Sequence, residues 1–469
     1  MNQASAAQWA HEEFRGLDLA DPRWQRRLVQ MGAQLARRPG GKVSAVITDD
    51  AERQGAYGLL ESTKVEPSSV ARTVFEAAAR RCAGEEFVFC AVDGTSLTLT
   101  DHERSKDFGP VGTRTQGARG LKVINALALS KQGVPLGLTS QEWWTRSDQR
   151  RKKHRDNLKP KEKEIAHWYE AMEHTREVLK SQAPGTRLWF QLDREGDAWP
   201  ILEQADKHEH WFTIRGHHNR RVRLPDGRMG YLREVLEQQP EVRTYQLSVT
   251  AGKRRSAREA TMVLRTCSVV LDFRDKATNR HFPKEVTVVL TREEGTTPAG
   301  EKPIEWMLLT NRPIATVQDL NQVIFGYSLR WRIEDFHRTW KSGACCVEDS
   351  QLRSPDAVKK WATILAAVAV RIERIKLLSR EQPERPASDE FTPIEIRAIT
   401  LLYFGTSAKK RPPNVETVTL AQATFWLAKI GGYTGKSSAA APGSVTLARG
   451  LKEVGAAVRT LEALEVRRD

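Results

Sequence analysis

The sequence predicts a mixed α/β fold flanked by helical regions, and three patterns lead to this expectation. Apolar residues recur at helical spacing near both ends of the chain. Short apolar runs typical of strands alternate with helical segments in its middle, and a mostly β stretch follows. We therefore expect a helical region over 1–70, a core over 71–378 with a β-rich insertion at about 221–312, and a helical region over 379–469.

The composition limits the kind of partner. The 469 residues include 74 Lys and Arg against 59 Asp and Glu, and the net charge of +15 indicates a polyanionic partner. Apolar residues make up 39% of the chain, which excludes a disordered or fibrous protein. The chain has no run of 18 apolar residues and its start lacks a signal-peptide pattern, so we expect a cytoplasmic protein without a membrane partner. Five cysteines without C-x-x-C spacing support neither a disulfide framework nor a zinc site.

The first strongly patterned helix is expected to be basic on its exposed faces. Asp21-Pro22 is a typical helix start. An apolar stripe follows at steps of 4, 3 and 4 residues: Trp24, Leu28, Met31 and Leu35. Four arginines on this helix or just beyond its end are expected to contact nucleic-acid phosphates: Arg26, Arg27, Arg37 and Arg38. A solvated charged face is the alternative, and the excess of one sign favours phosphate contact.

The core is expected to alternate strands and helices. Helices are predicted up to residue 57, over 67–81 and up to about 181, and strands over 87–92, 96–100, 123–130, 188–192 and 211–215. Asp93 and Asp193 stand where two of these apolar runs end. If those strands are neighbours in a sheet, the two carboxylates converge at one edge. A single Asp at a strand end is more often a turn former, so neither residue is diagnostic alone.

The insertion and the C-terminal region have their own patterns. The insertion is expected to contain strands at 245–249, 261–271, 285–290 and 306–309. A long helix is predicted from about 317 and another over 355–378. The last helix carries an apolar seam at 4-3-4-3 spacing: Leu447, Leu451, Val454, Val458 and Leu461. This seam fits packing on the same chain and packing on a second chain equally well.

The stretch 327–341 is predicted to be one helix with a polar stripe. At 100° per residue, four polar side chains fall within about 60°: Tyr327, Arg330, Glu334 and Lys341. Five apolar residues form the expected core face: Phe325, Leu329, Ile333, Phe336 and Trp340. Asp335 points away from Glu334 and is the poorer candidate for a site. An ordinary salt-bridged surface is the alternative explanation of the stripe.

Several motifs in a fixed order resemble those of cut-and-paste DDE transposases of the insertion-sequence-four type, and most nearly the transposon-five group. They are D-P-R-x-x-x-R-L-V from Asp21, G-A-Y at 55–57, D-G-T-S at 93–96, Q-E-W-W at 141–144, D-R-E-G-D at 193–197, W-x-L-L-T at 306–310, W-R-I-E-D-F-H-R-T-W-K at 331–341 and G-G-Y at 431–433. The resemblance spans nearly the whole chain, and it implies a ribonuclease-H-like catalytic core with a β-rich insertion.

The resemblance also implies roles for individual residues. Asp93, Asp193 and Glu334 correspond to the triad that binds two Mg²⁺ ions, for which Mn²⁺ can substitute. Six further residues correspond to DNA-contacting positions, with Tyr327, Arg330 and Lys341 at end phosphates, Trp306 stacking a flipped base, Trp331 beside it, and Arg215 near the active site. Histidines such as His337 are expected at the surface or beside phosphates rather than as metal ligands.

The function predicted on this basis is that of a DNA transposase. Such an enzyme binds terminal inverted repeats, excises the element through a hairpin and joins its ends to target DNA. The resemblance implies a homodimer in the synaptic complex with double-stranded DNA. Two alternatives stay open at the level of sequence: a metal-dependent nuclease with the same core but without strand transfer, and a catalytically idle DNA-binding regulator.

Overall fold

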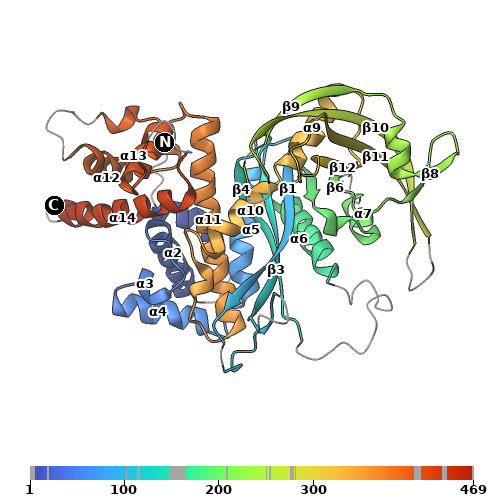
Figure 1. Ribbon diagram of the computed structural model, residues 1–469. Coiled ribbons are helices and arrows are strands. Elements are labelled where there is room, and N and C mark those ends of the chain that lie inside the picture. Colours follow the sequence, from blue (N-terminus) through green and yellow to red (C-terminus); the bar gives the residue numbers. More distant parts are fainter. Residues whose placement is uncertain are drawn as a thin grey trace.

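The computed structural model describes most of the chain in one mixed α/β arrangement. The described residues are 6–17, 21–101, 103–112, 117–147, 164–206, 210–249, 251–252, 255–274, 279, 281–405, 413–435 and 441–466. Helices lie mainly on one side of the molecule and a large sheet on the other (Figure 1). None of the described helices combines the length and apolar character needed to span a membrane.

The N-terminal region is helical, as expected. Its helices are α1 (Ala6–Phe14), α2 (Pro22–Arg37), α3 (Val43–Val46), α4 (Asp50–Glu61) and α5 (Pro67–Cys82). The carboxylate of Asp21 caps α2 by accepting a hydrogen bond of 2.9 Å from the backbone N–H of Arg23. Leu28, Met31 and Leu35 are buried, which confirms the predicted apolar stripe.

The central strands form the middle of one sheet. They are β1 (Phe87–Leu99), β2 (Gly109–Pro110), β3 (Arg119–Leu129), β4 (Pro135–Trp144), β5 (Arg187–Leu192) and β6 (Trp211–Arg215). Their order is β4–β3–β1–β5–β6, and β2 pairs with β3. Strand β3 is antiparallel to both of its neighbours β4 and β1, whereas β5 is parallel to both β1 and β6. The expected mixed α/β character is confirmed.

One prediction about these strands is wrong, and one strand was missed. Residues 87–92 and 96–100 were expected as separate strands, but β1 runs through both, so Asp93 lies within a strand and not at its end. The pairing of Gly94 with Ile124 and of Thr95 with Val123 on β3 keeps the turn-like residues extended. Strand β4 was not expected at all.

Helices cover both faces of the central sheet. Alternate residues of β1 enter two different apolar cores: Phe87, Phe89 and Ala91 face one, and Val88, Cys90 and Val92 face the other. Helix α6 (Ala166–Gln182) packs on the second face, whose core also includes residues of α7 (Trp199–Asp206). The first face packs against α9 (Val317–Ser328), α10 (Trp331–Lys341) and α11 (Pro355–Glu381). By alternation, Asp93 belongs to this first face.

The β-rich stretch continues the same sheet. It comprises β7 (Arg221–Arg223), β8 (Met229–Tyr231), the short helix α8 (Leu232–Glu237), β9 (Arg243–Val249), β10 (Arg258–Arg274), β11 (His281–Glu294) and β12 (Glu305–Thr310). All four strands predicted here are present. Strand β12 pairs with β6, with Leu308 opposite Arg215, so twelve strands of the described chain form one sheet.

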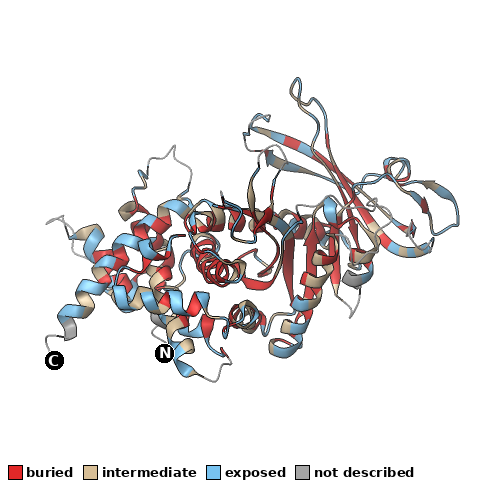
Figure 2. Ribbon diagram, turned by 90° about the horizontal axis from the view of Figure 1, so that it is seen from below, coloured by how far each residue is buried: buried red, intermediate tan, exposed pale blue. Residues whose placement is uncertain are grey.

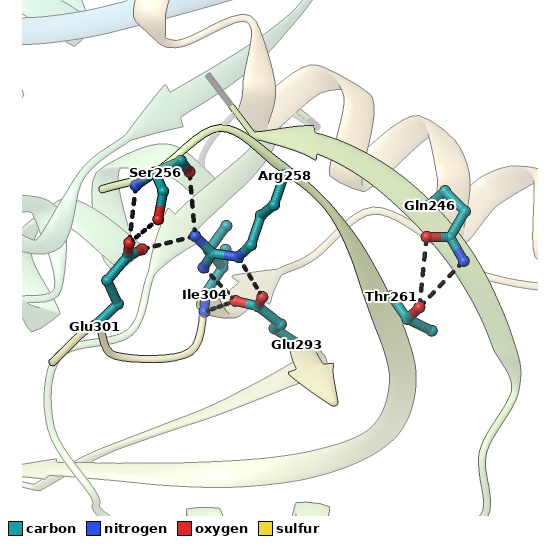
Figure 3. Close-up of polar contacts among 7 residues, drawn as sticks. All are labelled: Gln246, Ser256, Arg258, Thr261, Glu293, Glu301 and Ile304. Carbon is teal, nitrogen blue, oxygen red and sulfur yellow. Dashed lines mark hydrogen bonds and ion pairs between the residues drawn. The ribbon is translucent and has the colours of Figure 1, made fainter. Parts of the chain in front are cut away.

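An ion-pair network joins β10 and β11 to the loop before β12. Arg258 of β10 lies 2.7 Å from a carboxylate oxygen of Glu293 on β11 and 2.7 Å from one of Glu301 (Figure 3). Glu293 also accepts the backbone N–H of Ile304 at 2.9 Å. These contacts fix the chain immediately ahead of Trp306.

The C-terminal region is helical and packs on its own chain. It contains α12 (Pro393–Phe404), α13 (Leu420–Ile430) and α14 (Ser444–Val466), with short 3₁₀ turns at Ala387–Asp389 and Val415–Thr417. The predicted seam of α14 is used within the chain, because Leu447, Leu451, Val454 and Val458 are buried and the helix contacts α2, α12 and α13. Burial is densest in the sheet and the helices packed on it (Figure 2).

Candidate active site

Parallel strand pairing brings Asp93 and Asp193 to one place. Ala91 of β1 is paired with Gln191 of β5, and each aspartate lies two residues further along its chain. Asp193 follows the end of β5 and caps the 3₁₀ turn Arg194–Gly196, where its carboxylate accepts the N–H of Glu195 at 2.7 Å. Asp193 thus lies at the end of a strand, as expected, whereas Asp93 lies within β1. The condition on which the convergence of the two carboxylates depended is met, because β1 and β5 are neighbours.

The predicted helix over 327–341 is broken. Helix α9 ends at Ser328 and α10 begins at Trp331, and the N–H of Arg330 bonds to the carbonyl of Tyr327, three residues back, at 3.1 Å. A turn of this kind is tighter than an α-helical turn and shifts the faces on its two sides. Phe325 consequently leaves the expected core face and is 43% exposed, whereas the four apolar residues after it are buried as predicted.

Arg330 joins two of the predicted acids. Its Nη1 lies 3.1 Å from Oδ2 of Asp93, and its Nη2 lies 2.8 Å from Oε1 of Glu334. The guanidinium is buried, as is Tyr327 one turn before it. The alternative of a solvent-exposed surface is therefore wrong for Tyr327 and Arg330, whereas Glu334 and Lys341 are partly exposed.

The acids repel one another. Burial raises the pKa of Asp93 to about 7, and the negative charge of Asp193 adds to this effect, while Arg330 opposes it. A carboxylate cluster with one compensating arginine favours a further cation. Oxygen ligands of this kind suit Mg²⁺ or Mn²⁺, so these residues fit a divalent metal site. Among the described residues no three such groups are close enough to hold a metal as they stand, and Arg330 lies between the carboxylates of Asp93 and Glu334.

A cleft of about 420 Å³ opens beside Asp93 and Glu334. Its lining comes from β1, α10 and the segment after α10: Asp93, Gly94, Thr95, Glu334, His337, Arg338, Lys341, Ser342 and Glu348. Lys341 lies 3.4 Å from Oγ1 of Thr95 and 3.6 Å from a carboxylate oxygen of Glu348. Asp335 is absent from this lining and pairs with Arg338 at 3.1 Å. Glu348 was not singled out from the sequence, because nothing in its spacing marks it.

The base-stacking candidate lies beside the phosphate candidates. The rings of Trp306 and Tyr327 meet edge to face, 5.5 Å apart at an angle of 66°. Arg215 and Arg330 both approach the Tyr327 hydroxyl, and they oppose the rise that burial causes in its pKa. Arg215 also donates a 2.8 Å hydrogen bond to the carbonyl of Glu305. Trp331 is 55% exposed, with the Arg330 guanidinium 5.4 Å from its ring centre.

The four arginines of the basic helix are not part of this cleft. Arg26 is exposed on α2. Arg27 packs against Gly55 of α4, and Arg38 follows the end of α2 with its backbone N–H bonded to Gln34. Arg37 forms a 2.8 Å ion pair with Glu462 of α14. The structure thus gathers the acids and their neighbours at the cleft, while these arginines lie on or just after α2, outside it.

Two family models match the chain. A model described as "Transposase DNA-binding" matches residues 6–65, which include α2. A model described as "Transposase DDE domain" matches residues 120–371, more than half of the chain, including Asp193 and Glu334. DNA is therefore a partner of this protein, its function is that of a DNA transposase, and members of the DDE family typically use divalent metal ions. The chain belongs to the family of DDE transposases.

Proposed function

We propose that this transposase is of the insertion-sequence-four type, near the transposon-five group, and that it excises its element through a hairpin and joins the ends to target DNA. The observation that carries the proposal is the Arg330 guanidinium between Asp93 and Glu334, with the charge of Asp193 acting on Asp93. Strand order supports a ribonuclease-H-like core, because β4, β3 and β1 are antiparallel neighbours and β5 and β6 add in parallel. The proposed division is 1–70, 71–378 and 379–469.

The three acids are proposed to hold the metal. Two Mg²⁺ ions, or Mn²⁺ in their place, supply nucleophile activation and stabilise the leaving 3′ oxygen when bound. Asp93 and Glu334, which contact the Arg330 guanidinium in this structure, would hold the metal instead. Arg330 would then be available to the DNA phosphate together with Lys341 and Tyr327, and these groups would neutralise and align it.

Trp306 is proposed to stack an unpaired base. A blunt end folds into a hairpin only when a base near the break leaves the helical stack, and an aromatic ring recovers about 1–3 kcal/mol of the cost. Trp306 is partly buried and contacts Tyr327 from the strand next to Arg215. It therefore stands beside the residues assigned to the end phosphates.

The triad is tested by substitution. Asp93→Asn, Asp193→Asn and Glu334→Gln should each abolish Mg²⁺-dependent nicking of a terminal-repeat duplex and leave end binding intact, because the metal stabilises charge and is not needed for folding. Asp335→Asn is the matched control, since Asp335 does not itself line the cleft and pairs with the lining residue Arg338, and it should keep most activity. Full nicking by Glu334→Gln would show that α10 does not contribute to the active site.

Analysis of the products separates the alternatives. Strand-joined target DNA excludes the nuclease without strand transfer, and nicking by the wild-type chain that the triad variants lack excludes the idle regulator. Hairpin ends on the excised fragment are expected as an intermediate. Each subunit of the proposed homodimer acts in a synaptic complex that holds both element ends.

A further inference from the structure

A chain of buried polar side chains leads from α11 to the floor of the cleft. Oγ1 of Thr363 donates to Oε1 of Gln141 at 2.9 Å, and Nε2 of Gln141 donates to Oδ1 of Asn125 at 2.8 Å. Nδ2 of Asn125 lies 3.0 Å from Nε2 of His337. These four residues come from α11, β4, β3 and α10, and each is buried. Buried polar groups joined in this way fix one another's orientation.

The direction of the chain sets the form of the histidine. A threonine hydroxyl that donates to Gln141 leaves the glutamine amide to donate to Asn125, and the asparagine amide then donates to His337. Nε2 of His337 must accept this bond, so the proton of the neutral imidazole sits on Nδ1. Burial, with the nearby charges of Lys341 and Arg330, lowers the pKa of His337 to about 3 and keeps the ring neutral.

His337 also borders the cleft. His337 is a lining residue, one turn after Glu334 and one turn before Lys341 on the same face of α10. Asn125, which holds its Nε2, is the strand partner of Asp93. Among the described residues Nδ1 has no hydrogen-bond partner, although Nε2 is firmly held. Two positions were expected for His337, at the protein surface or beside phosphates, and the first is wrong because only 7% of the residue is exposed.

We propose that His337 is a phosphate-binding residue whose Nδ1–H donates a hydrogen bond to a non-bridging oxygen of the scissile phosphate. Asn125, Gln141 and Thr363 are its positioning residues. The inference rests on the proposed function, since the acceptor is the DNA phosphate brought to Asp93 and Glu334. A neutral donor suits this place, because it binds the phosphate without adding a charge that competes with metal ions for the carboxylates.

The inference is tested with phosphorothioate DNA. Replacing either non-bridging oxygen of the scissile phosphate by sulfur weakens a hydrogen bond to that oxygen in one diastereomer and not in the other. With the enzyme in excess, the wild-type chain should nick one diastereomer more slowly in both Mg²⁺ and Mn²⁺, and His337→Ala should remove that difference. On the normal phosphate, His337→Ala should slow nicking about 10- to 100-fold, as expected for one lost hydrogen bond to a charged acceptor, and leave end binding within about twofold.

Substitutions in the hydrogen-bonded series Thr363–Gln141–Asn125–His337 separate an effect on the position of His337 from an effect on the stability of the fold. Thr363→Val removes a hydroxyl three hydrogen bonds away from the imidazole and should slow nicking about two- to fivefold with an unchanged melting temperature. Thr139→Val is the matched control. Thr139, on β4, is buried like Thr363 of α11, but its hydroxyl bonds to Thr175 of α6 and not to the series of side chains that ends at His337. His337→Asn keeps an amide near the position of Nδ1 and should recover part of the rate lost in His337→Ala.

The outcomes are distinct from those of the proposed function. If His337→Ala keeps the diastereomer difference, or if Thr363→Val and Thr139→Val lose the same amount of activity, the inference fails while the transposase assignment stands. If the wild-type chain nicks no terminal-repeat DNA under any metal, the proposed function itself fails.

Discussion

Among the buried charged residues, Lys360 shows how a single side chain can hold α11 against the segment that follows α4. Its Nζ donates to the backbone carbonyls of Ser62 at 2.8 Å and Val65 at 2.9 Å, just beyond the end of α4, and the residue is 2% exposed. Carbonyls after a helix end have no partner within the helix, so the ammonium supplies one. Burial lowers the pKa of Lys360, yet these contacts satisfy its donors.

Lys360→Met is therefore expected to destabilise the fold by at least about 2 kcal/mol, because buried carbonyls lose their donor. Urea denaturation measures this loss. Lys359→Met is the matched control: Lys359 pairs at 3.0 Å with Asp356, whose side chain is 60% exposed, and its loss should cost no more than about 0.5 kcal/mol. Equal loss for both variants would contradict the capping role.

Trp306 has two possible roles with different consequences. A core tryptophan changed to Ala lowers the free energy of unfolding by about 3–5 kcal/mol and damages every activity. We expect instead that Trp306→Ala leaves the melting temperature and the first nick nearly intact and slows hairpin formation about ten- to a hundredfold. A time course of nicked, hairpin and double-strand-cleaved products, with a melting curve, decides between them. Normal hairpin kinetics or a collapse in melting temperature refutes stacking.

The identities of the proposed site residues could be predicted from the sequence better than their contacts. Asp193 follows a recognisable apolar run, and the spacing of Glu334 from Arg330 puts both on one helical face. The bridge from Arg330 to Asp93 joins residues 237 positions apart, and the bond from His337 to Asn125 joins residues 212 apart. Side-chain contacts of this range depend on strand register and helix packing, which no local pattern encodes.

At the scale of elements, local signals worked where one pattern dominated. Strand β5 was expected because an apolar run broken only by Gln191 precedes Asp193, and α2 because its apolar stripe follows a capping pair. Strand β4 was missed because Gly137 and the polar residues after it disguise a strand. A Cβ at Gly137 would lie 2.4 Å from that of Ala78, so the glycine allows α5 to approach β4 closely. Strand β1 was divided wrongly because its pairing with β3 overrides the turn propensity of Gly94 and its neighbours.

Helix α2 is where DNA-end binding is expected. Arg26→Ala should weaken binding to the terminal repeat and reduce the slope of log affinity against log salt by about one unit, as for one lost phosphate contact. The sequence predicted the same for Arg37→Ala, but the Arg37 guanidinium is engaged by Glu462. Titrations at several salt concentrations test both. An unchanged slope for Arg26→Ala would show that this face of α2 is an ordinary solvated surface and does not contact phosphates.

At the scale of the whole molecule, the β-rich stretch extends the catalytic sheet and places Trp306 next to its last central strand. Strand β12 pairs with β6 and is followed directly by α9, which leads into α10. The residues assigned to base stacking, phosphate binding and metal binding are thus joined through one continuous sheet and one broken helix. A shift of β12 is therefore expected to move Trp306 relative to Tyr327.

Pairing of subunits is also a property of the whole chain. The apolar seam of α14 is buried against helices of the same chain, so it is not free to join a second copy. We therefore expect the protein to be a monomer without DNA and to pair only when two DNA ends are bound. Mass photometry of the free protein and of its DNA complex measures the number of chains in each.

A gel-shift experiment with ends of two lengths tests this pairing directly. Glu334→Gln is used so that DNA stays uncut, with a short and a long terminal-repeat duplex in the same mixture. A complex that holds two ends gives three species, containing two short, one short and one long, or two long duplexes, whereas a complex with one end gives two. Because each end is expected to contact α2, all three species should weaken together when Arg26→Ala is added to the same protein. Two species only, or a stable dimer without DNA, contradicts pairing through bound ends.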